Sequence, residues 1–347
     1  MAGRVASLDA LRGLAVLFML EVHLGFWWAK SLPQDNALVA AGTMLGGMAA
    51  PLFFVLAGAG LSLSREREPG HFVRRSVLRG AALLLVGILF TFIEQAVYGP
   101  FGWGVLQCIG LSVIICAPLL MVPKHGRVVL GIGLIGAAAL LRPLLGVPDL
   151  LYSDQMMAVG SVADYLRNML VSGFFPVLPW LGFMVMGTTI GESVAASEGR
   201  AGPRVDSGLL TALMMLLAGV LLTVYGIRPE FFPASLSFSL LACGIVLLAI
   251  PLFLSADIGK PGPLADLGRV SLTIFIVHHL VGHEAFRALG LLHSFDLPTT
   301  LSLVLAAWAL ALAAGWAWAR VDFRGSLERA LSRLGRPPNK INTPPND

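Results

Sequence analysis

Residues 235–254 read SLSFSLLACGIVLLAIPLFL, a run without a single charged side chain. About 20 consecutive apolar residues are needed for an α-helix to cross the hydrocarbon core of a bilayer. Backbone polar groups inside lipid have to pair within their own segment or within a closed barrel. A run this long and this apolar therefore predicts a transmembrane helix.

Comparable runs recur along the whole chain. The 347 residues are 56% hydrophobic and 13% charged, whereas soluble domains carry about 25% charged residues. We therefore predict an all-α fold, a polytopic integral membrane helix bundle with about ten transmembrane helices. The predicted spans are 10–28, 42–63, 80–98, 104–122, 128–146, 171–190, 207–227, 235–254, 270–290 and 298–319.

The basic residues predict the orientation of these spans. With a cytoplasmic N-terminus and ten alternating spans, most of the 24 lysines and arginines fall on the side of the N-terminus, as the positive-inside rule requires. We expect both termini in the cytoplasm and a multi-pass protein of the cell membrane. Topology then explains the net charge of +4, and no nucleic-acid partner is expected.

The chain is expected to form one transmembrane domain over residues 1–322. Residues 323–347 are basic and rich in proline, which predicts a cytoplasmic tail that begins with an amphipathic segment on the inner leaflet. On the outer side, the link 147–170 either covers a site or is a solvated connector. The first span is expected to stay in the mature protein, because charged residues interrupt it.

Ionisable groups inside the spans are the first functional candidates, because each costs roughly 2.5 to 3.5 kcal/mol on insertion scales. Polar and ionisable residues of this kind occur in the first, third, fourth and ninth spans. They are Asp9, Arg12, Glu21, His23, Glu94, Gln95, Gln107, His278, His279, His283 and Glu284.

The first span carries Asp9, Arg12 and His23 on one helical face, since about 100° separates successive residues. Asp9 and Arg12 are one turn apart and can pair. His23 lies about 16 Å above Arg12 at 1.5 Å per residue. Glu21 points to a different side of the helix. The simpler interpretations are an ion pair at the helix start and a hydrogen-bonded histidine near the interface.

In the ninth span, His279 and His283 have the i, i+4 spacing of two metal ligands. The histidines of the loops are isolated in the sequence, so no metal is expected. The sequence leaves two interpretations of the ninth-span histidines. At least one of them contacts the substrate, or they only pack against neighbouring side chains. The cytoplasmic link before the third span carries Arg74, Arg75 and Arg79, which suit either a phosphate group or anchoring on the inner leaflet.

Several motifs resemble one family, and they occur in the family's order. They are SLDALRGLA at 7–15 followed by His23, APLFFVLAG at 50–58, the arginines of 74–79, GVLQCIG at 104–110, FPVLPWLG at 175–182 and LGRVSL at 267–272 followed by His278. Together they resemble the transmembrane acyltransferase superfamily, which includes the acyltransferase-3 proteins and the bacterial relatives of heparan-alpha-glucosaminide N-acetyltransferase.

This resemblance implies transfer of an acyl group, most simply acetyl, from cytoplasmic acyl-CoA to an acceptor across the membrane, such as a sugar hydroxyl or amine of a glycan. It makes His23 the reactive imidazole, and it implies coenzyme contacts and supporting roles for a further set. The coenzyme contacts are Arg12, Arg74, Arg75 and Arg79, and the supporting residues are Asp9, Gln107, Trp180, His278 and His279.

Two positions depart from the heparan enzyme, which has an asparagine in place of His23 and an arginine in place of Cys108. His23 matches the acyltransferase-3 pattern instead. The sequence does not identify the acceptor or the acyl chain length. It also leaves open whether transfer is direct or passes through an acyl-histidine intermediate, and whether the protein is a monomer or a homo-oligomer in the lipid. The alternative function is a transporter of small solutes or lipids that uses the intramembrane histidine, glutamate and arginine side chains.

Overall fold

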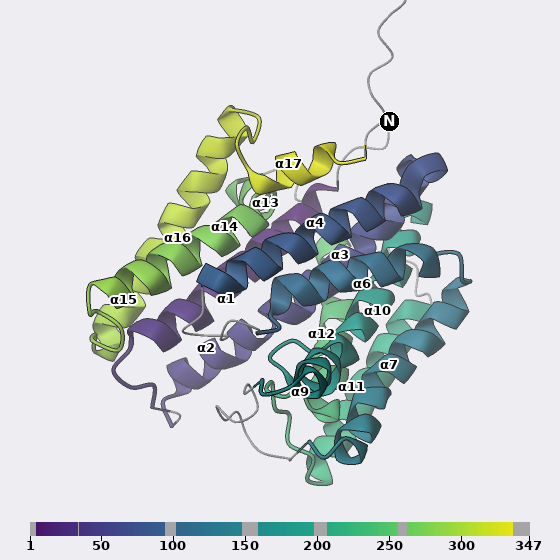
Figure 1. The fold of residues 1–347 in the computed structure, drawn as a ribbon, viewed down its shortest axis with the longest axis horizontal. Coiled ribbons are helices and arrows are strands. Elements are labelled where there is room, and N and C mark those ends of the chain that lie inside the picture. The colour runs from purple at the N-terminus through teal and green to yellow at the C-terminus, as the bar shows by residue number, and fades with distance from the viewer. Residues whose placement is uncertain are drawn as a thin grey trace, which may run out of the picture.

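The computed structural model describes residues 5–33, 35–93, 102–147, 159–197, 207–255 and 262–335. These residues form helices and no strand beyond one isolated bridge, so the prediction of an all-α polytopic bundle is confirmed (Figure 1). The helices are α1 (Ala6–Trp28), α2 (Ala37–Gly47), α3 (Ala49–Arg67), η1 (Pro69–His71), α4 (Phe72–Ile93), α6 (Val105–Leu119), α7 (Lys124–Leu144), α9 (Val162–Arg167), η2 (Asn168–Ser172), α10 (Val177–Ser197), α11 (Ser207–Val224), α12 (Leu236–Ser255), α13 (Pro263–Gly268), α14 (Ser271–His278), η3 (His279–Ala285), α15 (Phe286–Ala288), α16 (Leu297–Arg320) and α17 (Leu327–Arg333).

Seven of the described helical segments are long and apolar enough to cross a membrane, rather than the ten that the sequence predicts. Two of the remaining predicted spans, α6 and α11, form shorter apolar helices. The ninth span is divided into α14, the π-helix η3 and α15. The seven segments are Ala6–Trp28, Ala37–Arg67, Pro69–Ile93, Lys124–Leu144, Val177–Ala196, Leu236–Leu254 and Leu297–Arg320.

Side-chain caps mark the starts of α2 and α16. The Asn36 side chain accepts hydrogen bonds from the backbone amides of Leu38 and Val39 at the start of α2, at 2.9 and 3.3 Å. Asp296 accepts from the Thr299 amide at the start of α16, at 3.0 Å. These caps satisfy amides that have no partner inside the helix.

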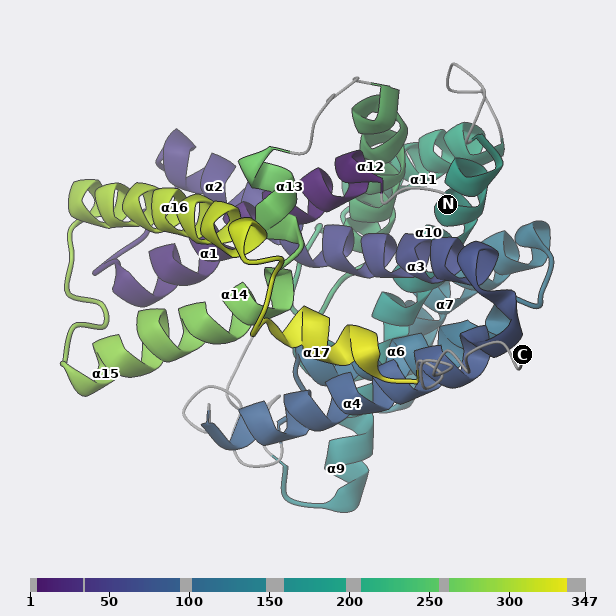
Figure 2. The same cartoon turned by 90° about the horizontal axis from the view of Figure 1, so that it is seen from above.

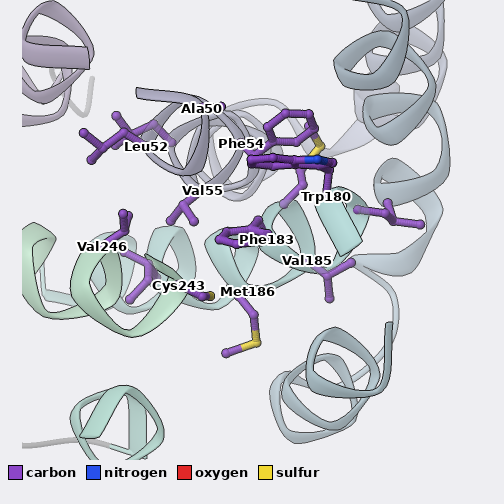
Figure 3. Close-up of a cluster of buried hydrophobic side chains, with 14 of the residues drawn as sticks. Ala50, Leu52, Phe54, Val55, Trp180, Phe183, Val185, Met186, Cys243 and Val246 are labelled. Atoms are coloured by element: carbon purple, nitrogen blue, oxygen red, sulfur yellow. The ribbon is translucent and has the colours of Figure 1, made fainter. Parts of the chain in front are cut away.

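The interior contains two clusters of apolar side chains. One lies between α3, α6, α10 and α12, where the ring of Phe54 packs on Trp180 with 5.1 Å between centroids (Figure 3). The second lies between α1, α14 and α16 and includes Leu20, Leu24 and Phe275. In Figure 1 these three helices lie on one side of the molecule, and α7, α11 and α12 lie on the other.

The short helix α13 packs against the first half of α1 and the last half of α16. Gly13 permits this approach, because a Cβ atom there would be 1.9 Å from the Leu264 carbonyl oxygen. A Cβ atom on Gly268 of α13 would likewise be 1.9 Å from the Asp9 carbonyl oxygen of α1. The start of α1 and the end of α16 thus meet at the same end of the bundle.

The helix α17 lies against α4 and α14 (Figure 2). The Glu328 carboxylate accepts hydrogen bonds from the backbone amides of Leu272 and Thr273, at 2.6 and 3.1 Å. Val270, at the N-cap of α14, offers no side-chain cap, so Glu328 satisfies these amides from another helix. The first part of the expected tail is therefore tied to the bundle, and residues 336–347 lie outside the described residues.

Two other predicted features fall partly outside the described residues. The structure does not describe Glu94 and Gln95 of the third predicted span, nor residues 148–158 of the outer link. The described part of that link forms α9 and the start of η2. The Ser161 side chain caps α9 by accepting a hydrogen bond from the Asp164 amide at 3.2 Å.

Candidate active site

A cavity of about 420 Å³ penetrates the bundle, and we call it the central cavity. Arg12 and His23, eleven residues apart on α1, both line it. Apolar side chains form most of its wall, and α3, α4, α6 and α14 contribute many of them, as is usual for ligand pockets. The polar members of the described lining are Arg12, His23, Thr43 and Ser271, and Leu331 of α17 lines the cavity as well.

Arg12 is held in place at the wall of this cavity. Its Nη1 atom donates to the Asp9 carboxylate at 2.7 Å, and its Nη2 atom donates to the Leu56 carbonyl oxygen at 3.2 Å. Asp9 is buried, with 3% of its surface exposed. The expected Asp9–Arg12 pair is therefore present, and it fixes a guanidinium group at the cavity wall.

His23 belongs to a cluster of three histidines. The Nδ1 atom of His23 lies 2.9 Å from Nε2 of His278, and the two ring planes are tilted by 9°. The His279 ring lies 5.4 Å from the His23 ring and 4.3 Å from that of His278, measured between centroids. Helix α1 and the ninth span thus meet at a group of imidazoles.

The change from α-helix to π-helix lies inside this cluster, between His278 and His279. In a regular α-helix, consecutive side chains point about 100° apart. Here the rings of both residues contact His23 and also Trp27. Single π turns inside helices occur frequently at functional sites.

The Trp27 ring contacts four imidazole rings. Its centroid is 5.2 Å from that of His23, 5.6 Å from that of His278, 4.9 Å from that of His279 and 5.0 Å from that of His283. Sequence reasoning missed this role, although Trp27 follows His23 by four residues and therefore shares its helical face. Phe90 and Phe275 also contact the His279 ring, at 5.3 and 4.7 Å between centroids.

A protein-family model described as heparan-alpha-glucosaminide N-acetyltransferase, catalytic, matches residues 4–229. The match covers well over half of the chain. The chain belongs to this family of membrane acetyltransferases. A second family model, described as a protein of unknown function (DUF418), matches residues 204–334. The comparison with curated proteins found no match.

The acetyltransferase match includes Arg12 and His23 of the central cavity. The match to the family of unknown function includes His278 and His279. In this member of the acetyltransferase family, the histidine cluster is therefore assembled from both matched regions. A histidine pair that spans residues 23 and 278 has no local signal in the sequence.

The three histidines offer ring nitrogens within 4.8 Å of one another, the described group that comes nearest to a metal site. Zinc binds imidazole nitrogen at about 2.0–2.1 Å in a tetrahedral arrangement, so two nitrogens on one zinc ion are about 3.3 Å apart. The contact between His23 and His278 is 2.9 Å, which suits a shared proton. His279 and His283, which have the spacing of two metal ligands in the sequence, are not both in this group, which consists of His23, His278 and His279. His283 Nδ1 instead faces Glu284 at 2.9 Å.

The arginines predicted to hold coenzyme phosphates have separate surroundings. Arg75 is buried and forms an ion pair with the Glu68 carboxylate. Arg79 donates to the Ser332 carbonyl oxygen of α17 at 2.9 Å. Arg74 is exposed on α4. Arg12 is the predicted phosphate contact that lines the central cavity.

Two of the supporting residues lie in structural positions. The Gln107 side chain accepts from the Gly104 amide at 3.1 Å and donates to the Thr91 hydroxyl at 2.5 Å, so it holds the start of α6 against α4. Trp180 is fully buried in the core (Figure 3). Its ring packs on Phe175, which lines the cavity, with 5.3 Å between centroids.

Proposed function

We propose that the protein transfers an acetyl group from cytoplasmic acetyl-CoA to a hydroxyl or amine acceptor, such as a sugar, on the far side of the membrane. The observation that carries this proposal is that Arg12 and His23 line the same cavity. Membership of the acetyltransferase family supplies the reaction class.

The geometry supports Arg12 as a contact for the coenzyme. A guanidinium group presents a planar fork of donors that matches phosphate oxygens. The Nη1 and Nη2 atoms of Arg12 already donate to Asp9 and to the Leu56 carbonyl, so the group is oriented before any substrate arrives. Its distance from His23 along α1, about 16 Å at 1.5 Å per residue, is comparable to the reach of an extended pantetheine arm.

His23 supplies the proton chemistry of the transfer. The acceptor oxygen or nitrogen forms a bond to the acyl carbon, and the carbon–sulfur bond of the thioester breaks. The proton of the acceptor passes to His23 and then to the departing thiolate, which leaves as free coenzyme A. This is general base and general acid catalysis by one imidazole.

A variant of His23 tests the proposal. Purified protein in lipid nanodiscs is incubated with acetyl-CoA and a panel of sugars and amines, and the release of free thiol is measured. We expect His23→Ala to lower the acceptor-dependent rate by at least about 10²-fold, the usual contribution of a general base. His125→Ala is the matched control, because His125 is exposed on α7.

Two results would contradict the proposed reaction. One is wild-type protein that releases no thiol with any acceptor while it moves a solute across proteoliposomes, as a transporter does. The other is full activity of His23→Ala in protein that binds acetyl-CoA normally.

A further inference from the structure

The histidine cluster contains one hydrogen bond in which the donor is not in doubt. His278 Nδ1 lies 3.2 Å from the carbonyl oxygen of Ile274, one turn earlier in α14. A carbonyl oxygen accepts and never donates. The proton of a neutral His278 ring is therefore on Nδ1, and its Nε2 atom carries a lone pair.

The second bond follows from the first. His278 Nε2 faces His23 Nδ1 at 2.9 Å, and with a lone pair on Nε2 the proton of this contact has to come from His23. The two rings are nearly parallel, and their centroids are 5.2 Å apart. The centroid distance exceeds the nitrogen distance because the rings meet edge to edge, so the nitrogens point at each other in the ring plane.

We propose that His278 is a positioning residue that fixes the tautomer of His23 through a chain from the Ile274 carbonyl to His278 and then to His23. The chain holds the proton of neutral His23 on Nδ1 and leaves the lone pair on Nε2, the nitrogen that then accepts the acceptor's proton. This inference rests on the proposed function for its catalytic meaning, but the tautomer itself is a separate observable.

The surroundings of the pair support this role. Which imidazole nitrogen carries the proton is set by the hydrogen bond that the other nitrogen makes. His278 is 6% exposed, and Trp27 stacks against both rings at 5.2 and 5.6 Å between centroids. Water therefore competes little with His278 for His23 Nδ1. Once His23 is doubly protonated during transfer, the same bond stabilises the imidazolium.

Two substitutions of His278 separate positioning from structure. In His278→Gln the side-chain carbonyl oxygen can still accept from His23 Nδ1, whereas His278→Leu has no acceptor. We expect the leucine variant to lower kcat by about 10²-fold or more, the scale of losing a group that orients a catalytic histidine. KM for acetyl-CoA should stay within about twofold, and the glutamine variant should recover most of the activity.

The tautomer is measured directly by the ¹⁵N shifts of protein labelled at histidine, with His23→Gln to assign the His23 signals. Wild-type and His278→Gln proteins should show a protonated Nδ1 and an unprotonated Nε2. In His278→Leu this pattern should be lost. His125→Gln is the control that removes a remote histidine and leaves the pattern unchanged.

The outcomes distinguish the two proposals. A protonated Nε2 on His23 in the wild-type protein overturns the tautomer assignment, even if His278→Leu fails to fold. Active protein in which His278→Leu keeps full kcat overturns the positioning role. If the protein shows the assigned tautomer but transfers no acyl group, the hydrogen-bond chain stands and the proposed reaction is rejected.

Discussion

At the scale of single residues, one face of α1 carries both an ion pair and a histidine. The buried Asp9 forms an ion pair with the partly exposed Arg12, and the same arginine lines the cavity that His23 also lines. The sequence left an ion pair and a coenzyme contact as competing interpretations. Asp9 accepts from Nη1 and the Leu56 carbonyl accepts from Nη2, and the same side chain lines the central cavity, so the ion pair does not exclude the proposed coenzyme contact.

A double variant separates the two roles of Arg12. Arg12→Gln should destabilise the protein by about 3 kcal/mol or more, because it leaves Asp9 buried without its ion pair. Asp9→Asn combined with Arg12→Gln should recover most of this loss in thermal unfolding, since no buried charge remains. KM for acetyl-CoA should stay raised by about tenfold or more in both variants. If the double variant restores KM together with stability, Arg12 serves the fold and not the coenzyme.

At the scale of elements, the approach of α13 to α1 depends on the absence of side chains. We expect Gly13→Ala to destabilise the protein by about 1–3 kcal/mol, the cost of inserting an atom into packed structure. The clash is with the backbone of Leu264, which cannot rotate away as a side chain can.

Gly25→Ala is the matched control on the same helix, since a Cβ atom there meets nothing within 4 Å. Alanine is a better helix former than glycine by roughly 0.5–1 kcal/mol, so this variant should be neutral or more stable. Thermal unfolding in detergent measures both. Equal stability of the two variants would show that α13 does not pack on α1 as described.

At the scale of the whole molecule, the cavity has to be open to substrates for transfer across the membrane. We expect Ala57→Cys on α3, which lines the cavity, to react with a small thiol reagent, and coenzyme A to slow this reaction. Ala59→Cys is the control, because Ala59 is 0% exposed. The native cysteines are buried, which keeps the background low. Equal reactivity at both positions, or no effect of coenzyme A, would argue against an open passage.

Local patterns in the sequence predicted much of this architecture. Hydropathy over 20-residue windows identifies helices that cross a membrane because lipid leaves the backbone few alternatives. Helical periodicity likewise put Asp9, Arg12 and His23 on one face, since the spacing of 3.6 residues per turn is a property of one segment. The same approach overestimated the number of long spans, because an apolar window does not show that α6 and α11 are shorter helices or that a π-helix interrupts the ninth span.

By itself, the sequence determined that this chain is a helical membrane protein of an acyltransferase type, with an intramembrane histidine above a paired arginine. Only the tertiary structure decided that His278 meets His23 across 255 positions of sequence, that Trp27 joins the histidines, and that Arg79 holds α17. These contacts depend on how separate helices pack. Which helices pack against each other is decided by how the side chains of two helices fit together. The periodicity of a single helix carries no information about this fit.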